Sequence, residues 1–165
     1  MKIRFNLVAL FLFLSCSHHI KTNKFETNEF SILYPEKLVF NDGNEEGAVF
    51  ILKSTPTSPD DVFIENINLV TQEVNEVEFV EFANQTVSKI EGFAEVEKSE
   101  IININTINCL RIVFSMKQNN LDLKFIQHYL IKGNKMYLLT FSSESKFYND
   151  YYEEMNNVLM SFKLK

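Results

Sequence analysis

Between residues 94 and 141, four strand-like segments follow one another with only short polar turns between them. The segments are residues 94–104, 106–116, 121–131 and 136–141, and the turns lie near 103–105, 117–120 and 132–135. Strands joined by a short turn run antiparallel, because a parallel pair needs a crossover connection of a dozen or more residues. The sequence therefore predicts an antiparallel sheet built from successive hairpins, and this constrains the fold more than any other feature.

Residues 76–91 carry an apolar stripe with the period of an α-helix. The stripe consists of Phe79, Phe82, Ala83, Thr86, Val87 and Ile90. Asn75 and Glu78 have the spacing of an N-terminal capping box, and Gly92 supplies the stop. We expect an amphipathic helix that packs on the sheet and buries Phe82 there.

The remaining segments complete one α+β domain over residues 29–165. Strand-like segments are expected at 30–34, 48–52 and 63–70, and a second helix at 145–159. Ser143 or Ser145 is its candidate cap, and aromatic residues on both of its faces leave its buried side open. Residues 125–131 are apolar on both faces, so the sheet needs cover on both sides. We expect a single antiparallel sheet flanked by helices.

The first residues resemble a bacterial lipoprotein signal peptide. Lys2 and Arg4 precede the apolar run 7–14, and Ser15 precedes Cys16. The run is far shorter than the roughly 20 residues of a membrane-crossing helix. We expect removal of residues 1–15, a lipid on Cys16, and a polar tether over residues 16–28. The protein would then be anchored to a membrane of the bacterial cell envelope and face the periplasm or the exterior. The alternative is a cut nearby that leaves Cys16 unmodified.

Charge and cysteine content narrow the partners. The formal net charge is −6, and it becomes more negative when Lys2 and Arg4 are removed with the signal peptide. Nucleic-acid binding depends on cationic contacts with phosphate, so we expect no nucleic-acid partner. If Cys16 carries a lipid, Cys109 has no cysteine left to bridge with. Cys109 lies in the apolar run 109–114, which indicates a small buried hydrophobic residue and not a nucleophile.

No pattern in the chain indicates a catalytic, cofactor or metal site. His18 and His19 are adjacent in the expected tether, where they lack fixed geometry. His128 shares an alternating strand face with Asp122 and Lys124, and we expect it near a polar edge. A histidine beside an acid can act as a general base, but no nucleophile motif accompanies it. The four glycines form no phosphate-binding loop.

Three tyrosines on the second predicted helix are candidates for a binding surface. Tyr148, Tyr151 and Tyr152 belong to a set of aromatic residues, most of which the core requires. A surplus of aromatic side chains at a surface can mark an interaction site. We therefore treat these three residues as a candidate patch for a protein partner.

Several segments resemble the PsbP-like family in their order and spacing. They are residues 30–35 (FSILYP), 61–70, 132–140 and 160–163. The resemblance spans residues 30–165 and implies an antiparallel sheet between helical layers, an α–β–α sandwich. The family includes an extrinsic photosystem II subunit, a nuclear-import factor that binds a small GTPase, and DcrB-type bacterial envelope lipoproteins. This chain departs from the family in having no tryptophan after the Tyr34-Pro35 turn; we expect Leu38 or Phe40 in its place.

These family members share no chemistry, so the resemblance does not select a function. Our leading expectation is a non-enzymatic, membrane-anchored envelope lipoprotein that acts as a protein-binding or assembly accessory factor, without a cofactor. The alternative is a small-molecule, metal or lipid binder that uses a cleft between sheet and helix. The third is an enzyme of unrecognised type. A large pocket with converging polar groups favours the second, and a flat exposed aromatic patch favours the first.

Overall fold

The hairpins expected between residues 94 and 141 form the centre of the computed structural model, which describes residues 21–42, 47–56 and 61–165. Four strands pair antiparallel in sequence order: β6 (Glu95–Ile104), β7 (Ile107–Gln118), β8 (Leu121–Lys132) and β9 (Lys135–Glu144). Asn119 and Asn120 form the β7–β8 turn with φ of 51° and 65°. Asparagine tolerates this left-handed conformation better than most residues, and consecutive positive φ angles match the twist of a hairpin.

The large sheet has seven strands in the order β3-β4-β5-β9-β8-β7-β6, and all of its pairs are antiparallel. β5 (Asn66–Glu73) pairs with β9 over its whole length. β4 (Phe50–Lys53) and β3 (Val39–Asn41) extend the sheet beyond β5. The antiparallel prediction is confirmed.

The prediction of a single sheet is wrong, because a second, three-stranded sheet has the order β1-β2-β10. It consists of β1 (Thr22–Glu26), β2 (Phe30–Pro35) and β10 (Lys163–Leu164). β1 is an edge strand in which every residue except Phe25 is exposed, so its sequence reads as polar. The tether expected over residues 16–28 therefore does not extend through β1. Residues 1–20, which hold the expected signal peptide and Cys16, lie outside the described residues.

The two helices form where the sequence predicts them, with different N-termini. α1 (Phe79–Glu91) ends at Gly92 as expected. Its N-cap is Glu78, which makes no side-chain capping hydrogen bond, so the predicted capping box is wrong. α2 (Tyr148–Met160) begins after Phe147, and no side chain caps it either. Among the described residues, no helix is long and apolar enough to cross a membrane.

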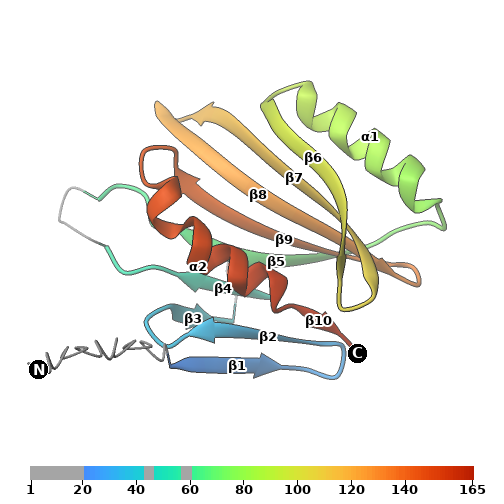
Figure 1. Cartoon of the computed structure of the whole chain (residues 1–165), viewed down its shortest axis with the longest axis horizontal. Helices are drawn as coiled ribbons and strands as arrows, with labels where there is room; N and C mark the ends of the chain where they lie inside the picture. The colour runs from blue at the N-terminus through green and yellow to red at the C-terminus, as the bar shows by residue number, and fades with distance from the viewer. Residues whose placement is uncertain (1–20, 43–46, 57–60) are drawn as a thin grey trace, which may run out of the picture.

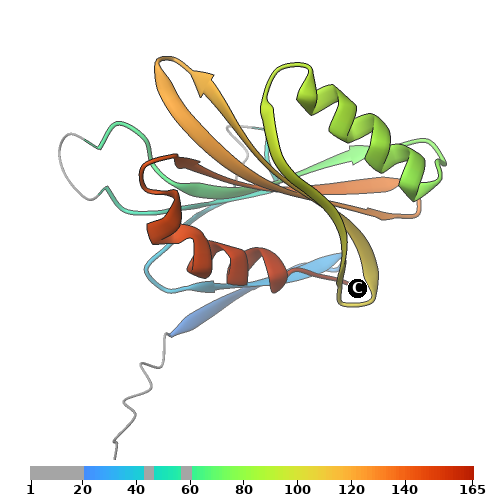
Figure 2. The same ribbon diagram turned by 45° about the horizontal axis from the view of Figure 1, so that its top comes forward.

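The helices lie on opposite faces of the large sheet (Figures 1 and 2). α2 and the small sheet cover one face and enclose the main core, which includes Phe50, Phe141, Met155 and Phe162. α1 packs over β6 and β7 on the other face and encloses a smaller cluster, the α1 core, which includes Ala83, Ile90, Leu110, Ile112 and Tyr129. Successive β7 residues alternate between the two cores, so the expectation of cover on both faces is confirmed.

Cys109 is a buried residue of the main core, as predicted, with 0% of its surface exposed. Burial raises the pKa of its thiol to about 12, so the reactive thiolate is scarce at neutral pH. In a Cys16→Ser background, we expect a thiol reagent to label Cys109 only after denaturation. Cys109→Ala should lower the free energy of unfolding by about 1 kcal/mol. Labelling of the native protein as fast as that of the denatured chain would contradict this prediction.

Candidate functional site

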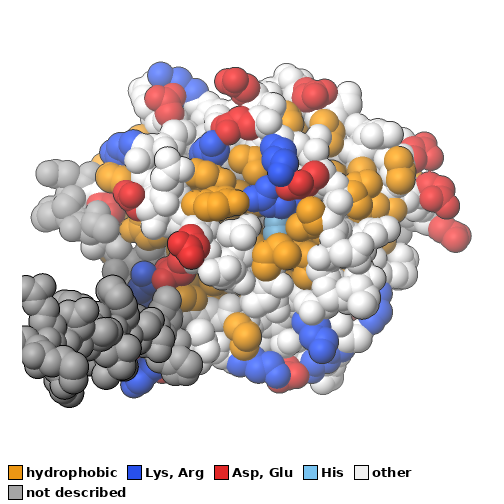
Figure 3. All heavy atoms as spheres, viewed as in Figure 1, with side chains coloured by type: hydrophobic (Ala, Val, Ile, Leu, Met, Phe, Trp, Pro, Cys, Tyr) orange, Lys and Arg blue, Asp and Glu red, His pale blue; other side chains and the backbone are white. Residues whose placement is uncertain are grey.

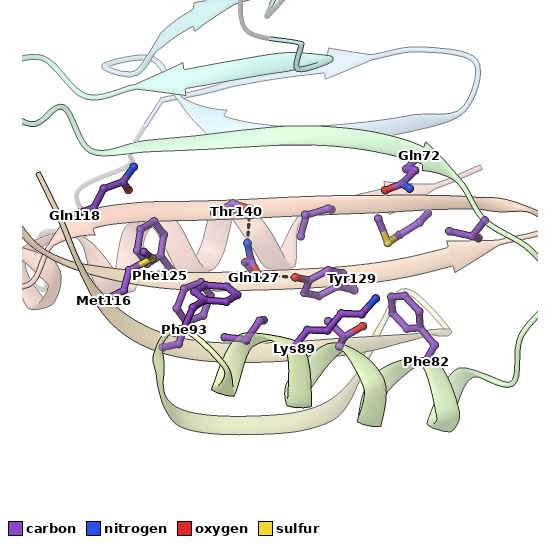
Figure 4. A pocket seen from close by; sticks show the side chains of 16 residues that line it. Gln72, Phe82, Lys89, Phe93, Met116, Gln118, Phe125, Gln127, Tyr129 and Thr140 are labelled. Carbon is purple, nitrogen blue, oxygen red and sulfur yellow. Dashed lines mark hydrogen bonds between the residues drawn. The ribbon is translucent and has the colours of Figure 1, made fainter.

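α1 covers only part of its face of the large sheet, and an open cleft of about 610 Å³ lies beside it (Figure 4). The floor comes from β5, β7, β8 and β9, and one wall comes from α1 and Phe93. The volume falls within the range of about 300–1,000 Å³ that is typical of small-molecule sites. The incomplete cover also explains why Phe82 is only partly buried, contrary to our expectation, since it lies at the edge of the α1 core and lines the cleft.

Aromatic and sulfur-containing side chains make up much of the lining. The rings of Phe114 and Phe125 stack with centroids 4.9 Å apart, and Phe82 meets Tyr129 edge-on at 5.9 Å. Met116 and Met136 also line the cleft. Flexible methionines and planar rings adapt to an apolar ligand without demanding one particular shape.

A short chain of hydrogen bonds crosses the floor of the cleft. The Tyr129 hydroxyl donates to Gln127 Oε1 at 2.5 Å, and Gln127 Nε2 donates to Thr140 Oγ1 at 3.4 Å. Burial raises the pKa of Tyr129 to about 12, so its hydroxyl stays neutral. These groups can orient a ligand, but none of them is a nucleophile or base that works at neutral pH.

Lys89 is the only charged residue among the described residues that line the cleft. It is exposed in the last turn of α1 and extends over the cleft (Figure 4). The lining therefore combines an apolar surface, neutral polar groups and one cation. No carboxylate, imidazole or thiol lies among these described lining residues.

A second cavity, of about 480 Å³, lies between α2 and the small sheet. Its lining includes Leu33, which is 45% exposed, and the acidic side chains of Asp150, Glu153 and Glu154. Glu154 is already paired with Lys37 at 3.0 Å. This smaller groove is a candidate site for a polar or peptide partner.

His128 lies in the interior of the large sheet and not near the polar edge that we expected. Its side chain is 0% exposed, and neither ring nitrogen hydrogen-bonds to any described residue. Burial lowers its pKa to about 3, and the charge of the opposing Arg111 adds to this shift. Arg111 itself binds Glu100 at 3.1 Å and the Tyr152 hydroxyl at 3.4 Å. His128 is therefore not placed to act as a general base, since its ring nitrogens contact no hydroxyl or thiol among the described residues.

The three tyrosines of α2 do not form one exposed patch. Tyr148 is buried and packs against Phe141, with ring centroids 5.9 Å apart. Tyr151 is partly buried against the main core. Only Tyr152 is an exposed large side chain, and charged residues interrupt the apolar ones on this face (Figure 3). A role for Tyr152 in partner binding stays a prediction.

A cleft between sheet and helix was one of the expected alternatives, but its lining residues, Lys89 among them, were not identified from the sequence. Cys16, His18 and His19 lie outside the described residues. Within the part of the chain that the structure describes, no group of three or more metal-binding side chains comes together. The one sequence signal for the cleft was that this face of the sheet carries more apolar residues than one helix can cover.

Comparison with solved structures identifies the fold. Cyanobacterial PsbP (CyanoP) from Synechocystis matches with a TM-score of 0.62 over 92% of this chain and 98% of that one, at 13% identity. The chain has the PsbP-like fold. LpqN of Mycobacterium tuberculosis also matches this PsbP-like chain, with a TM-score of 0.66 at 7% identity. The match covers 90% of this chain and 87% of LpqN, which is described as involved in cell envelope biogenesis.

A Pseudomonas aeruginosa protein of unknown function, a putative regulator, also shares the PsbP-like fold. Its TM-score is 0.61 at 11% identity, and the match covers 85% of this chain and 94% of that one. No family model and no curated protein matches the sequence. At these identities the likeness concerns the fold alone, and the function has to be argued from the cleft.

Proposed function

We propose that the protein is a non-enzymatic accessory protein of a bacterial cell envelope that binds an apolar or amphiphilic small molecule in the cleft beside α1. The cleft is the observation that carries this proposal. It has the volume of a ligand site, an adaptable apolar lining and the converging polar groups of Gln127, Tyr129 and Thr140. The three α2 tyrosines, by contrast, do not offer the flat aromatic surface that a protein-binding role would favour.

The chemistry of the lining supports binding rather than catalysis. The described lining residues hold no carboxylate, histidine or cysteine, and the Tyr129 hydroxyl is kept neutral by burial. Catalysis by proton transfer or nucleophilic attack needs such a group within hydrogen-bonding reach of the substrate. The role of LpqN in cell envelope biogenesis supports placing this chain in an envelope.

A protein partner remains the second candidate, because the groove between α2 and the small sheet combines exposed Leu33 with an acidic wall. Such a surface suits a peptide that carries both basic and apolar side chains. Loss of the partner in a Leu33→Asp variant, with ligand binding in the cleft unchanged, would support this role.

The proposed location depends on the lipid at Cys16. We expect Cys16→Ser to release the protein from membranes or to stall its processing, because lipid chains hold a protein firmly only when two or more are present. Membrane fractionation and electrophoretic mobility measure this. A variant that fractionates and migrates like the wild type would contradict the lipoprotein proposal.

Occupancy of the cleft is tested with a cleft-filling variant. Thr86 lines the cleft, whereas Ser88 lies on the exposed side of α1 and does not line it. We expect Thr86→Phe to weaken the binding of an apolar fluorescent probe about tenfold or more, and Ser88→Phe to leave it unchanged. Both variants add the same ring to the same helix, so the difference reports the cleft. Equal affinities in the two variants, or no probe binding by the wild type, would contradict the proposed function.

A further inference from the structure

We propose that the ligand of the cleft is a single-chain amphiphile with an anionic headgroup, carboxylate or phosphate, and that Lys89 binds this headgroup. The inference rests on the proposed function and specifies the chemical class of the ligand. Its supports are the pairing state of Lys89, the charge of the lining, and the arrangement of apolar side chains in the cleft.

Lys89 differs from most lysines of the described chain in having no acidic partner. Ion pairs with carboxylates are formed by Lys24, Lys37, Lys98, Lys117, Lys124, Lys135, Lys146 and Lys165. The side-chain ammonium of Lys89 forms no hydrogen bond or ion pair with any described residue, whereas the Gly92 amide donates to the backbone carbonyl of Lys89. Its ammonium is therefore available to a ligand without breaking an existing contact.

The charge of the lining is opposite to the charge of the protein. The whole chain carries a formal charge of −6, yet the only charged residue among the described lining residues is a lysine. A lysine in the last turn of a helix also complements the helix dipole, and that contribution needs no ligand. The dipole does not, however, account for the exclusion of acidic side chains from the lining of an acidic protein. A cation beside an apolar surface without acids favours an anionic amphiphile over a neutral or cationic one.

The apolar part of the cleft suits one hydrocarbon chain. In Figure 4, Lys89 reaches toward Tyr129, while Phe93, Met116 and Phe125 lie at the end of the cleft away from Phe82. Phe93 is 62% exposed, so an apolar rim faces solvent there and would be covered by a bound chain. The volume of about 610 Å³ is that of a small-molecule site, and we assign one chain to it.

The test compares amphiphiles that each carry one straight twelve-carbon chain, counting a carbonyl carbon where there is one, and differ in the headgroup. Dodecanoate, dodecyl phosphate, monolauroylglycerol and dodecyltrimethylammonium are titrated as monomers into the detergent-free full-length protein by displacement of the apolar probe. We expect one or both anionic compounds to bind more tightly than the neutral one, and the cationic compound to bind most weakly. The two anionic arms show whether the headgroup is a carboxylate or a phosphate. Added salt should reduce the anionic preference, because the site is open to solvent.

Lys89→Gln and Lys163→Gln form the matched pair of variants. Lys163 is exposed and lies in β10, outside the cleft, so its substitution makes the same change in net charge. Lysine and glutamine have similar helix propensities, so α1 should stay folded in Lys89→Gln. We expect Lys89→Gln to weaken anionic binding roughly threefold to fivefold, which is the strength of a partly exposed ion pair, and to leave neutral binding unchanged. Lys163→Gln should change neither.

The outcomes separate this inference from the proposed function. If the neutral compound binds as tightly as the anionic ones, or if Lys89→Gln and Lys163→Gln behave alike, the headgroup assignment is wrong while the cleft remains a ligand site. Affinity should also rise about threefold to fourfold for each added methylene. If no compound binds and the probe does not bind either, the proposed function itself is wrong.

Discussion

Phe141→Ala is expected to lower the free energy of unfolding by about 3–5 kcal/mol, which is the usual cost of removing a fully buried phenylalanine ring. Phe141 is 0% exposed in β9, the central strand of the large sheet, and its ring packs against Tyr148 of α2. The substitution leaves a cavity where sheet and helix meet. A loss of this size is a large part of the total stability of an ordinary domain. Urea unfolding followed by circular dichroism measures it.

Phe82→Ala is the control for that prediction. Phe82 is partly buried and lies at the open edge of the α1 core, so its removal exposes a wall of the cleft and does not create a closed cavity. We expect a loss of about 1–2 kcal/mol, because the transfer cost of the ring is incomplete and the cavity cost is absent. Equal losses for the two variants would contradict the assignment of main core and cleft edge.

Acidification is expected to destabilise the native protein through His128, by about 1.4 kcal/mol for each pH unit between pH 6.5 and the native pKa of about 3. The native state holds His128 neutral because the ring is buried, whereas the unfolded chain takes up a proton near the ordinary value of 6.5. The unfolded state therefore binds more protons in this window, and the free energy of unfolding falls as the pH falls. Summed over this window of about 3.5 pH units, the effect is of the order of 5 kcal/mol.

The His128→Leu variant isolates this contribution. Leucine fills this fully buried position without a polar group, and it removes two buried nitrogens that lack hydrogen-bond partners among the described residues. Such a replacement is close to neutral or stabilising at neutral pH.

Other titrating groups also change the stability of the protein in acid. Carboxylates whose pKa is lowered by lysines, such as Glu29 beside Lys135, stabilise the protein until the pH falls below the ordinary carboxyl pKa of 4.5. Glu65, whose pKa is raised by burial, acts in the opposite direction. These groups are common to both proteins, so the difference between the two pH profiles reports His128. Parallel profiles would contradict its burial as a neutral ring.

The parts of the fold that were predictable are those in which local sequence and tertiary structure agree. Alternating apolar residues and asparagine-containing turns specify β6 to β9, since the apolar residues supply the buried faces and the turn asparagines adopt the positive φ angles. The stripe of α1 and its stop at Gly92 were correct for the same reason. Capping was not predictable, because Asn75 and Glu78 have the right spacing but α1 begins after Glu78.

The predictions that were wrong concern residues whose packing partners lie far away in the sequence. β1 appeared to be a tether because an edge strand with one inward residue, Phe25, has no alternating pattern. Tyr148 appeared to be surplus because its burial depends on Phe141, which lies on another element. The residues that line the cleft were not identified because Met116 and Phe125 are residue types that usually fill a core. Only the position of α1 over β6 and β7 shows that it leaves them accessible to a ligand.

The most direct test of the account is to observe where a bound amphiphile contacts the protein. The chain has five methionines. Met116 and Met136 line the cleft, Met155 is buried in the main core, and Met160 lies exposed at the end of α2. In protein labelled with ¹³C at the methionine methyl groups, addition of dodecanoate should shift the Met116 and Met136 signals. The Met155 and Met160 signals should stay in place. Shifts confined to Met155 and Met160, or no saturable shift at all, would contradict a ligand site between α1 and the large sheet.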